Sequence, residues 1–246
     1  MKILVIADSP APYKVTFYEE ISKIHDVRIL FRHHILKDRK KEWFAKPDKL
    51  NCVFLSDNPI KRMFQIVKLN IDGFDLFWNM NYLTFDAIVL AIKFKIKHKL
   101  NLMHADGGIY KNRGFFLNGL VSFAMNLNDY FASSGIKTDE YYMKYGVNKN
   151  NIYRYMFSSV LSKNIQFNIK QKDSKQGNQI NLLSVGQMIP RKGFDILLKA
   201  IKNVDNVKLT LIGGKPTQQY LTIINNYNLS DKVEILDFMP FNELKD

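Results

Sequence analysis

The stretch INLLSVGQMIPRKGFDILLKAI, residues 180–201, contains the pattern that decides the fold. Its first part, 180–185, is a short apolar run typical of a buried parallel strand. A helix is then indicated by apolar residues at the i, i+3, i+4, i+7 spacing of one helix face, namely Phe194, Leu197, Leu198 and Ile201. The sequence therefore predicts a strand and a helix joined by a basic loop that contains Arg191 and Lys192.

This loop has the chemistry of a phosphate site. We expect the helix to open at Gly193, and a helix N-terminus offers unpaired backbone N–H groups and a partial positive charge. Arg191 and Lys192 add two side-chain cations at the same end, which suits a doubly charged phosphate group. The alternative is a solvated basic loop without a ligand.

The segment SVGQMIPRKGFDILLKA, residues 184–200, resembles the donor-phosphate segment of retaining GT-B glycosyltransferases of family 4, the group 1 glycosyltransferases. In that family a basic pair near this position binds the diphosphate of a nucleotide-sugar. The resemblance implies four residues for this role: Arg191, Lys192, Gly193 and Gln187. The family often has arginine where this chain has Gln187, and glutamine can hydrogen-bond phosphate but brings no charge.

Strand and helix signals alternate through the rest of the chain, which predicts an α/β fold with parallel sheets and two Rossmann-like domains, as in GT-B. Predicted strands lie at 3–7, 27–31, 52–55, 76–78, 100–103, 130–132, 180–185, 207–212 and 233–236. Predicted helices lie at 14–24, 60–69, 84–97, 115–127, 137–145, 194–201 and 218–227. We assign 1–161 to an N-terminal acceptor domain, the Asn-, Lys-, Gln- and Ser-rich 162–179 to a linker, and 180–246 to a partial donor domain.

The resemblance also implies that the second domain is incomplete. In the family, a segment like 233–244 precedes a paired-glutamate motif that holds the donor sugar and ribose, and the sequence ends at Asp246 before such a motif. We therefore expect a C-terminally truncated chain with impaired transfer. An inactive fragment that binds only nucleotide or a partner is the alternative, and a sugar-nucleotide epimerase of the same shape is a third.

Three further loops follow predicted strands, where parallel α/β sheets bind ligands. HADGG, 104–108, presents His104 and Asp106, which the resemblance implies as catalytic residues near the acceptor or the reacting sugar. ADSPAPYK, 7–14, resembles the N-terminal loop of capsule and surface-polysaccharide transferases at Pro12 and Tyr13, with an ordinary proline turn as the alternative. Gly213 and Gly214 permit close approach to a nucleotide, or form a tight turn.

Charge and composition limit the partners. The net charge is +13, and residues 1–165 contribute +10 of it, from 25 Lys and Arg against 15 Asp and Glu. This asymmetry fits a domain that meets an anionic membrane surface; it would also fit RNA, but the sequence contains no nucleic-acid motif. The resemblance implies a glycan or lipid-linked glycan acceptor. The resemblance implies a nucleotide-sugar donor, used as substrate, and no cofactor. No metal is expected, because no Cys/His cluster or Asp-x-Asp motif occurs.

Cysteine content and hydropathy predict a cytoplasmic protein. A location at the inner face of the membrane is the alternative. Cys52 is the single cysteine, and neither a signal peptide nor an apolar run of spanning length is present. The helical stripe with Phe115, Phe116 and Phe123 is expected in the core. An alternative contact with a membrane or a lipid-linked acceptor involves the segment with Tyr141, Tyr142, Lys144 and Tyr145.

Overall fold

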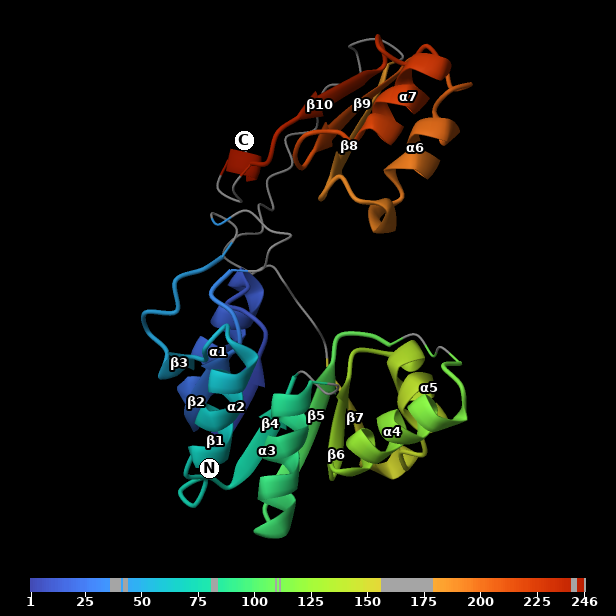
Figure 1. Ribbon diagram of the computed structural model, residues 1–246. Coiled ribbons are helices and arrows are strands. Elements are labelled where there is room, and N and C mark those ends of the chain that lie inside the picture. Colours follow the sequence, from blue (N-terminus) through green and yellow to red (C-terminus); the bar gives the residue numbers. More distant parts are fainter. Residues whose placement is uncertain are drawn as a thin grey trace. The chain divides into compact units, whose positions relative to one another are not determined.

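The computed structural model describes residues 1–35, 41, 44–80, 84–108, 110, 112–155, 179–239 and 243–245. The chain forms two compact units, Met1–Ile165 and Gln166–Asp246, called here the N-unit and the C-unit (Figure 1). The predicted linker 162–179 lies outside the described residues except for Gln179.

The N-unit contains a parallel sheet in the order β3-β2-β1-β4-β5-β6-β7. Its strands are β1 (Lys2–Ala7), β2 (Asp26–Phe31), β3 (Cys52–Phe54), β4 (Leu76–Asn79), β5 (Leu100–Ala105), β6 (Tyr130–Ser133) and β7 (Ile152–Arg154). The strand order reverses at β1, which pairs with β2 on one side and β4 on the other. Ligands of open α/β sheets bind at the carboxyl ends of strands near such a reversal.

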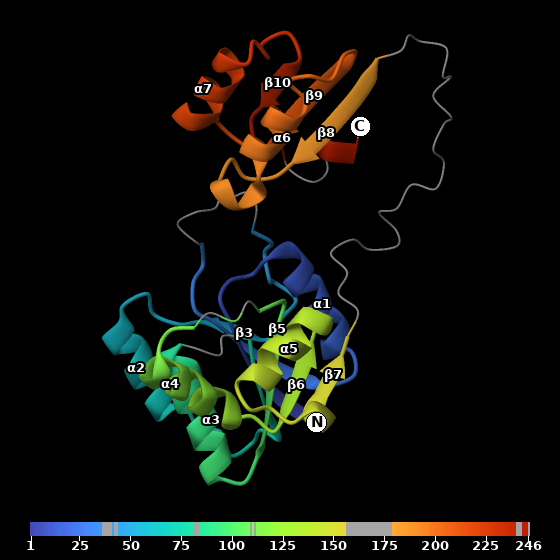
Figure 2. The same ribbon diagram turned by 90° about the vertical axis from the view of Figure 1, so that its right-hand side faces the viewer.

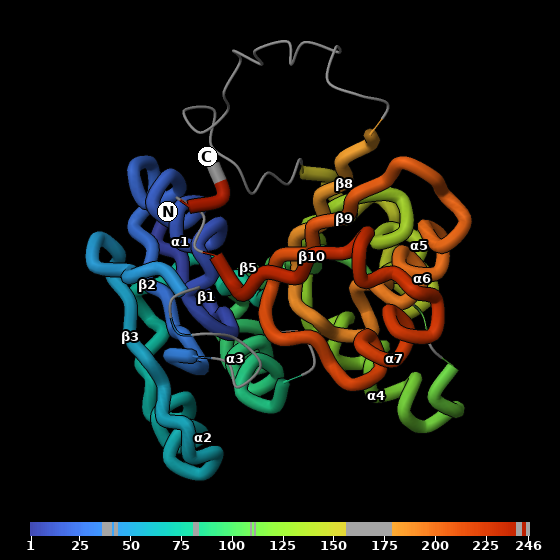
Figure 3. The backbone as a smooth tube through the Cα atoms, turned by 90° about the horizontal axis from the view of Figure 1, so that it is seen from above, coloured from blue at the N-terminus to red at the C-terminus, as the bar shows by residue number. Residues whose placement is uncertain are grey.

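Helices cover the two faces of this sheet unequally. They are α1 (Pro12–Ser22), α2 (Pro59–Lys68), α3 (Phe85–Ile96), α4 (Phe115–Asn126) and α5 (Ile136–Lys144), with a 3-10 turn at Lys149–Asn151. Figures 2 and 3 show α2, α3 and α4 on one side of the sheet and α1 on the other. This follows from right-handed crossovers, since β1 to β2 runs along the sheet in one direction and β3 to β7 in the opposite one.

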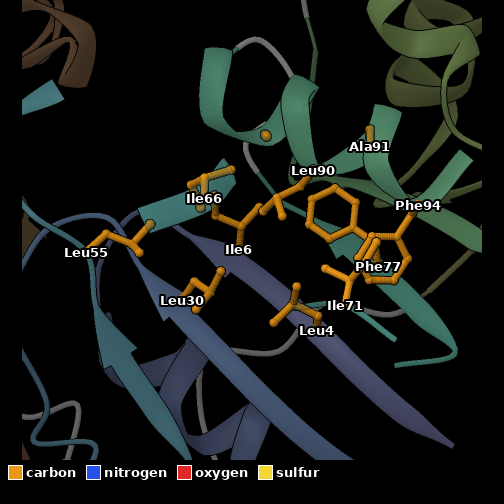
Figure 4. Packing of buried hydrophobic residues seen from close by; sticks show 11 residues of the cluster. Leu4, Ile6, Leu30, Leu55, Ile66, Ile71, Phe77, Leu90, Ala91 and Phe94 are labelled. Carbon is orange, nitrogen blue, oxygen red and sulfur yellow. The ribbon is translucent and has the colours of Figure 1, made fainter. Parts of the chain in front are cut away.

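The main core lies between the sheet and helices α2 and α3 (Figure 4). Leu4 and Ile6 of β1, Phe77 of β4, and Leu90 and Phe94 of α3 are fully buried there. A second cluster packs α1 on the opposite face, with Tyr18 and Phe31 at its centre. Because β1 is apolar on both faces, it is fixed from both sides, and its carboxyl end is a rigid support for a site.

The C-unit contains a smaller parallel sheet in the order β10-β9-β8. Its elements are β8 (Ile180–Val185), a 3-10 turn at Pro190–Lys192, α6 (Phe194–Ala200), β9 (Val207–Ile212), α7 (Gln218–Asn226), β10 (Val233–Leu236) and a 3-10 turn at Glu243–Lys245. Phe194, Leu198 and Tyr220 are buried between the helices and the sheet. The α/β prediction with parallel sheets is confirmed.

Two predictions about aromatic side chains are wrong. Phe115, Phe116 and Phe123 of α4, expected in the core, are 98%, 75% and 56% exposed. Conversely, the tyrosines proposed for a membrane contact, Tyr141, Tyr142 and Tyr145, are buried beside β6. Helix α4 is apolar except for a polar stripe of Asn118, Ser122 and Asn126, and its buried residues are Val121, Ala124 and Met125.

Candidate functional site

In the C-unit, the loops that follow β8 and β9 touch each other. Gly186 donates its N–H to the Ile212 carbonyl at 2.8 Å. A methyl group on Gly213, whose φ is +156°, would lie 1.6 Å from the Gly186 carbonyl oxygen. Only glycine allows this approach, and it brings Gly213 to the start of the predicted phosphate loop.

The basic pair follows in the same loop. Arg191 and Lys192 are exposed in the 3-10 turn. The side chain of Lys192 lies beside Gly186, because a Cβ added to Gly186 would be 3.5 Å from the Cδ and Cε atoms of Lys192. Gly193 has a left-handed φ of 69° and is the N-cap of α6. The Gln187 carbonyl accepts from the Ile189 N–H at 2.8 Å, which turns the chain toward the basic pair.

The structure thus places the predicted donor residues of the C-unit together at the carboxyl ends of β8 and β9. Gly214, which follows Gly213, has a φ of +121° and open space where a Cβ would stand. Two exposed cations beside closely packed backbone can hold an anionic group of phosphate size.

In the N-unit, three polar side chains meet at the carboxyl ends of β5 and β7. His104 Nε2 lies 3.0 Å from Asp106 Oδ1, and it also contacts the Tyr155 hydroxyl. Tyr155 donates its hydroxyl hydrogen to Asp106 Oδ1 at 2.9 Å. His104 is 4% exposed, whereas the Asp106 side chain is 40% exposed, so the histidine supports the carboxylate that faces solvent.

Aromatic rings hold His104 in place. Trp78 stacks on the His104 ring at a centroid distance of 5.9 Å, and Tyr155 meets it edge-on at 4.4 Å. A cavity of about 500 Å³ lies beside these rings, on the sheet face near α1. His104 Nδ1 and Trp78 Nε1, which both belong to its lining residues, are buried and have no hydrogen-bond partner among the described residues.

Asp106 is held in its ionised form. The hydrogen bond from His104 contributes most to keeping the pKa of the Asp106 carboxyl below its ordinary value; burial opposes this shift, and the Lys14 cation assists it. For Tyr155, burial and the neighbouring Asp106 carboxylate raise the pKa of the hydroxyl. At neutral pH the cluster therefore presents a carboxylate that a neutral phenol donates to.

The loop after β1 differs from its prediction. Pro12 and Tyr13, expected in a loop, form the first turn of α1, because the fixed φ of proline suits the first helical position. Arg32 connects this loop to α3, because it donates to Asp8 Oδ1 at 2.9 Å and to Asp86 Oδ2 at 2.8 Å.

Sequence reasoning missed Tyr155 and Arg32. Tyr155 follows β7, a strand of three residues that the apolar pattern does not reveal. Arg32 comes directly after β2, and its position at a strand end was the available signal. Within the described residues, no group of three or more His, Cys, Asp and Glu side chains is arranged to hold a metal ion.

Comparison with known sequences identifies a family for the C-terminal part. Residues 165–246 match the family model described as Glycosyl transferases group 1. No curated protein matches the chain.

Comparison with solved structures covers both units. The structure is similar to HepE of Anabaena in complex with UDP, with a TM-score of 0.69 at 16% identity over 99% of this chain and 71% of that one. WaaG, a glycosyltransferase involved in lipopolysaccharide biosynthesis, gives a TM-score of 0.64 at 12% identity, over 99% and 71%. A UDP-N-acetylglucosamine 2-epimerase from Rickettsia bellii gives 0.56 at 15% identity, over 99% and 70%.

At these identities the structural likeness establishes the fold, two Rossmann-like units as in GT-B proteins, and this fold serves both transferases and an epimerase. The family match over residues 165–246 adds evidence on the activity, which the fold alone does not give. Together they support a glycosyltransferase, and the likeness to group 1 is shown for residues 165–246.

Proposed function

We propose that this protein transfers a sugar from a nucleotide-sugar donor to a bacterial surface glycan, in the manner of the family 4 enzymes of capsule or lipopolysaccharide synthesis. The observation that carries the proposal is the convergence of Lys192, Gly186 and Gly213 in the C-unit, inside the segment that matches the family model. HepE was solved with UDP and with UDP-glucose, so a UDP-hexose is the donor to test first.

In this proposal the diphosphate lies on the loop after β8. Lys192 and Arg191 stabilise the negative charge that develops when the bond between the anomeric carbon and the diphosphate oxygen breaks. The acceptor oxygen forms its bond to the anomeric carbon on the same face, and its proton passes to the departing phosphate oxygen. The configuration at the anomeric carbon is then retained, without a metal ion.

Asp106 acts on the acceptor side of the reaction. A carboxylate with a lowered pKa is a weak base, so its role is to accept a hydrogen bond from the acceptor hydroxyl and to favour positive charge on the sugar ring. His104 and Tyr155 orient it. This assignment continues the prediction from HADGG and adds Tyr155 as a positioning residue.

Binding of UDP by calorimetry tests the donor site. Lys192→Ala should weaken UDP binding by roughly 10- to 150-fold, because a hydrogen bond to a charged group contributes about 1.5–3 kcal/mol. Lys199→Ala is the matched control, since Lys199 is an exposed lysine in the last turn of α6. Equal UDP affinity in wild type, Lys192→Ala and Arg191→Ala would reject the site.

Release of UDP from UDP-hexoses in the presence of glycan acceptors, with and without a chelator, tests the reaction. Metal-independent transfer predicts the same rate in both conditions. Tight UDP binding without any release of UDP would favour the alternative, an inactive nucleotide-binding chain. Conversion of UDP-N-acetylglucosamine to its epimer without an acceptor would favour an epimerase instead.

A further inference from the structure

A cavity of about 500 Å³ in the N-unit is lined by α2, by the start of α3 and by Arg32, which directly follows β2. Its polar end lies at the carboxyl edge of the sheet, because the two helices start after β3 and β4. Open α/β sheets bind ligands at this edge. Among the described residues, the cluster around Asp106 contributes nothing to the lining, so the cavity is a separate candidate site.

Two arginines share one carboxylate at the polar end of the cavity. Asp86 Oδ2 lies 2.8 Å from Arg32 Nε and 3.0 Å from Arg62 Nε. The side chains of Arg32, Arg62 and Asp86 are 15%, 12% and 3% exposed, so the group is largely withdrawn from water. Two positive charges thus stand against one negative charge, and a buried cation without a counter-charge is unfavourable. The group therefore suits one additional negative charge, which a bound monoanion would supply.

The remaining contacts of the two arginines leave this surplus charge in place. Asp8 accepts from Arg32 Nη1 at 2.9 Å, but it does not line the cavity, and water screens its charge because its side chain is 46% exposed. Arg62 Nη1 donates to the Ser56 carbonyl. The Nη2 groups of both arginines have no hydrogen-bond partner among the described residues, which leaves donors for a carboxylate.

The rest of the cavity wall is apolar and more exposed than the arginines. Phe64 of α2 and Phe85 of α3 are 62% and 68% exposed, and Ile60 and Val67 add aliphatic surface. A volume of about 500 Å³ is typical of a small-molecule site, and such sites combine apolar walls with a few polar groups. The occupant must therefore carry one anionic group next to apolar surface, such as the C–H face of a sugar ring.

We propose that this cavity binds the carboxylate of an acidic sugar, such as a uronic acid, in the acceptor glycan. The assignment to the acceptor rests on the proposed function. Arg32 and Arg62 bind the carboxylate, and Phe64 and Phe85 pack against the sugar ring; one surplus positive charge favours a carboxylate over a dianionic phosphate. The strand order β2-β1-β4-β5 separates the ends of β2 and β5 by three strand spacings, roughly 14 Å. The acidic sugar is therefore not the sugar that reacts beside Asp106 but another residue of the same glycan.

No described helix is long and apolar enough to cross a membrane. The test can therefore use the whole chain in water with small glycosides.

Calorimetric titration with phenyl β-D-glucuronide and phenyl β-D-glucoside tests the site, because the two compounds differ only in carboxylate against hydroxymethyl. Wild type should bind the glucuronide roughly 10- to 150-fold more tightly, as expected for hydrogen bonds to a charged group. Arg62→Gln should bring the ratio of the two affinities close to one. Lys68→Gln removes an exposed cation of α2 that does not line the cavity, and it should leave the ratio unchanged. Phe64→Ser should weaken both compounds by a similar factor.

Each of three results would overturn the proposal. They are equal affinity of wild type for the two compounds, an unchanged ratio in Arg62→Gln, and tighter binding of octyl phosphate that Arg62→Gln abolishes, which would assign the cavity to a phosphate. The wild-type ratio and Phe64→Ser keep the test valid even where Arg62→Gln fails to fold, since Phe64 is an exposed residue. Lys192→Ala should keep the preference for the glucuronide, and Arg62→Gln should bind UDP as wild type does. Failure of this site and failure of the donor site are therefore distinguishable.

Discussion

The close approach of Gly213 to Gly186 allows a sharp test of how the donor loop is built. Real Cβ atoms essentially never come within 3.0 Å of such an atom, and the Cβ of Gly213→Ala would stand 1.6 Å from the Gly186 carbonyl oxygen. The two loops must therefore separate by at least about 1.4 Å. Overpacking of this kind costs about 1–3 kcal/mol, and the φ of +156° adds about 1–3 kcal/mol of backbone strain for alanine.

Gly214→Ala is the matched control, because its φ of +121° carries the strain while nothing lies within 4 Å of the added methyl group. The difference between the two variants is then the overpacking alone, about 1–3 kcal/mol. Native-state hydrogen exchange of the β8 and β9 amides should be roughly 5- to 150-fold faster in Gly213→Ala than in Gly214→Ala. Equal exchange in both variants would refute the claim that the two loops are in contact.

Three other predictions concern the N-unit. Asp106→Asn should lower transfer about 100-fold or more, because it removes the charge that favours positive charge on the sugar ring. Since the folded pKa of Asp106 lies below the unfolded value of about 3.9, the carboxylate stabilises the fold fully above that pH and loses this contribution as pH falls through the folded pKa. Circular dichroism should therefore show that the variant is less sensitive to acid. Asp86→Ala should destabilise the N-unit by about 3–5 kcal/mol in urea unfolding, because it leaves Arg32 and Arg62 without their buried carboxylate; a loss below about 1 kcal/mol would show that the two arginines find other partners. Lys93→Met should cost about 0.3–1 kcal/mol, since Lys93 Nζ donates to carbonyls at the end of α2 at 2.7–3.0 Å, and an unchanged urea midpoint would contradict this.

The sequence predicted the fold correctly where the apolar periodicity and the residues at strand ends indicate the same elements. The apolar run 180–185, the basic loop and the helix from Phe194 appear in the structure in that order. The prediction that this strand is buried is wrong, because β8 lies at the edge of its sheet and Ile180, Leu183 and Val185 are more than half exposed. Strand β7 was not predicted, because its three residues, Ile152–Arg154, are too few to show an alternating pattern. Tyr155, which follows this strand, was missed for the same reason. Two of the three members of the N-unit cluster, His104 and Asp106, could therefore be predicted from the sequence, and the third, Tyr155, could not.

The orientation of helices was less predictable than their existence. The apolar part of helix α4 is wide enough to include both Phe116 and Met125, so its sequence does not say which of the two faces the sheet. The ion pairs of Arg32 join residues 24 and 54 positions away in sequence, and such partners follow from the strand order, which single-sequence periodicity does not supply.

Arg32 couples two elements at the carboxyl ends of the strands of the N-unit. Its guanidinium links Asp8, in the loop after β1, to Asp86 in the first turn of α3. The neighbour of Asp86 is Phe85, an exposed residue at the start of α3. Two charged contacts therefore join the start of α3 to the loop after β1, so any contact that immobilises the start of α3 also narrows the positions open to Asp8.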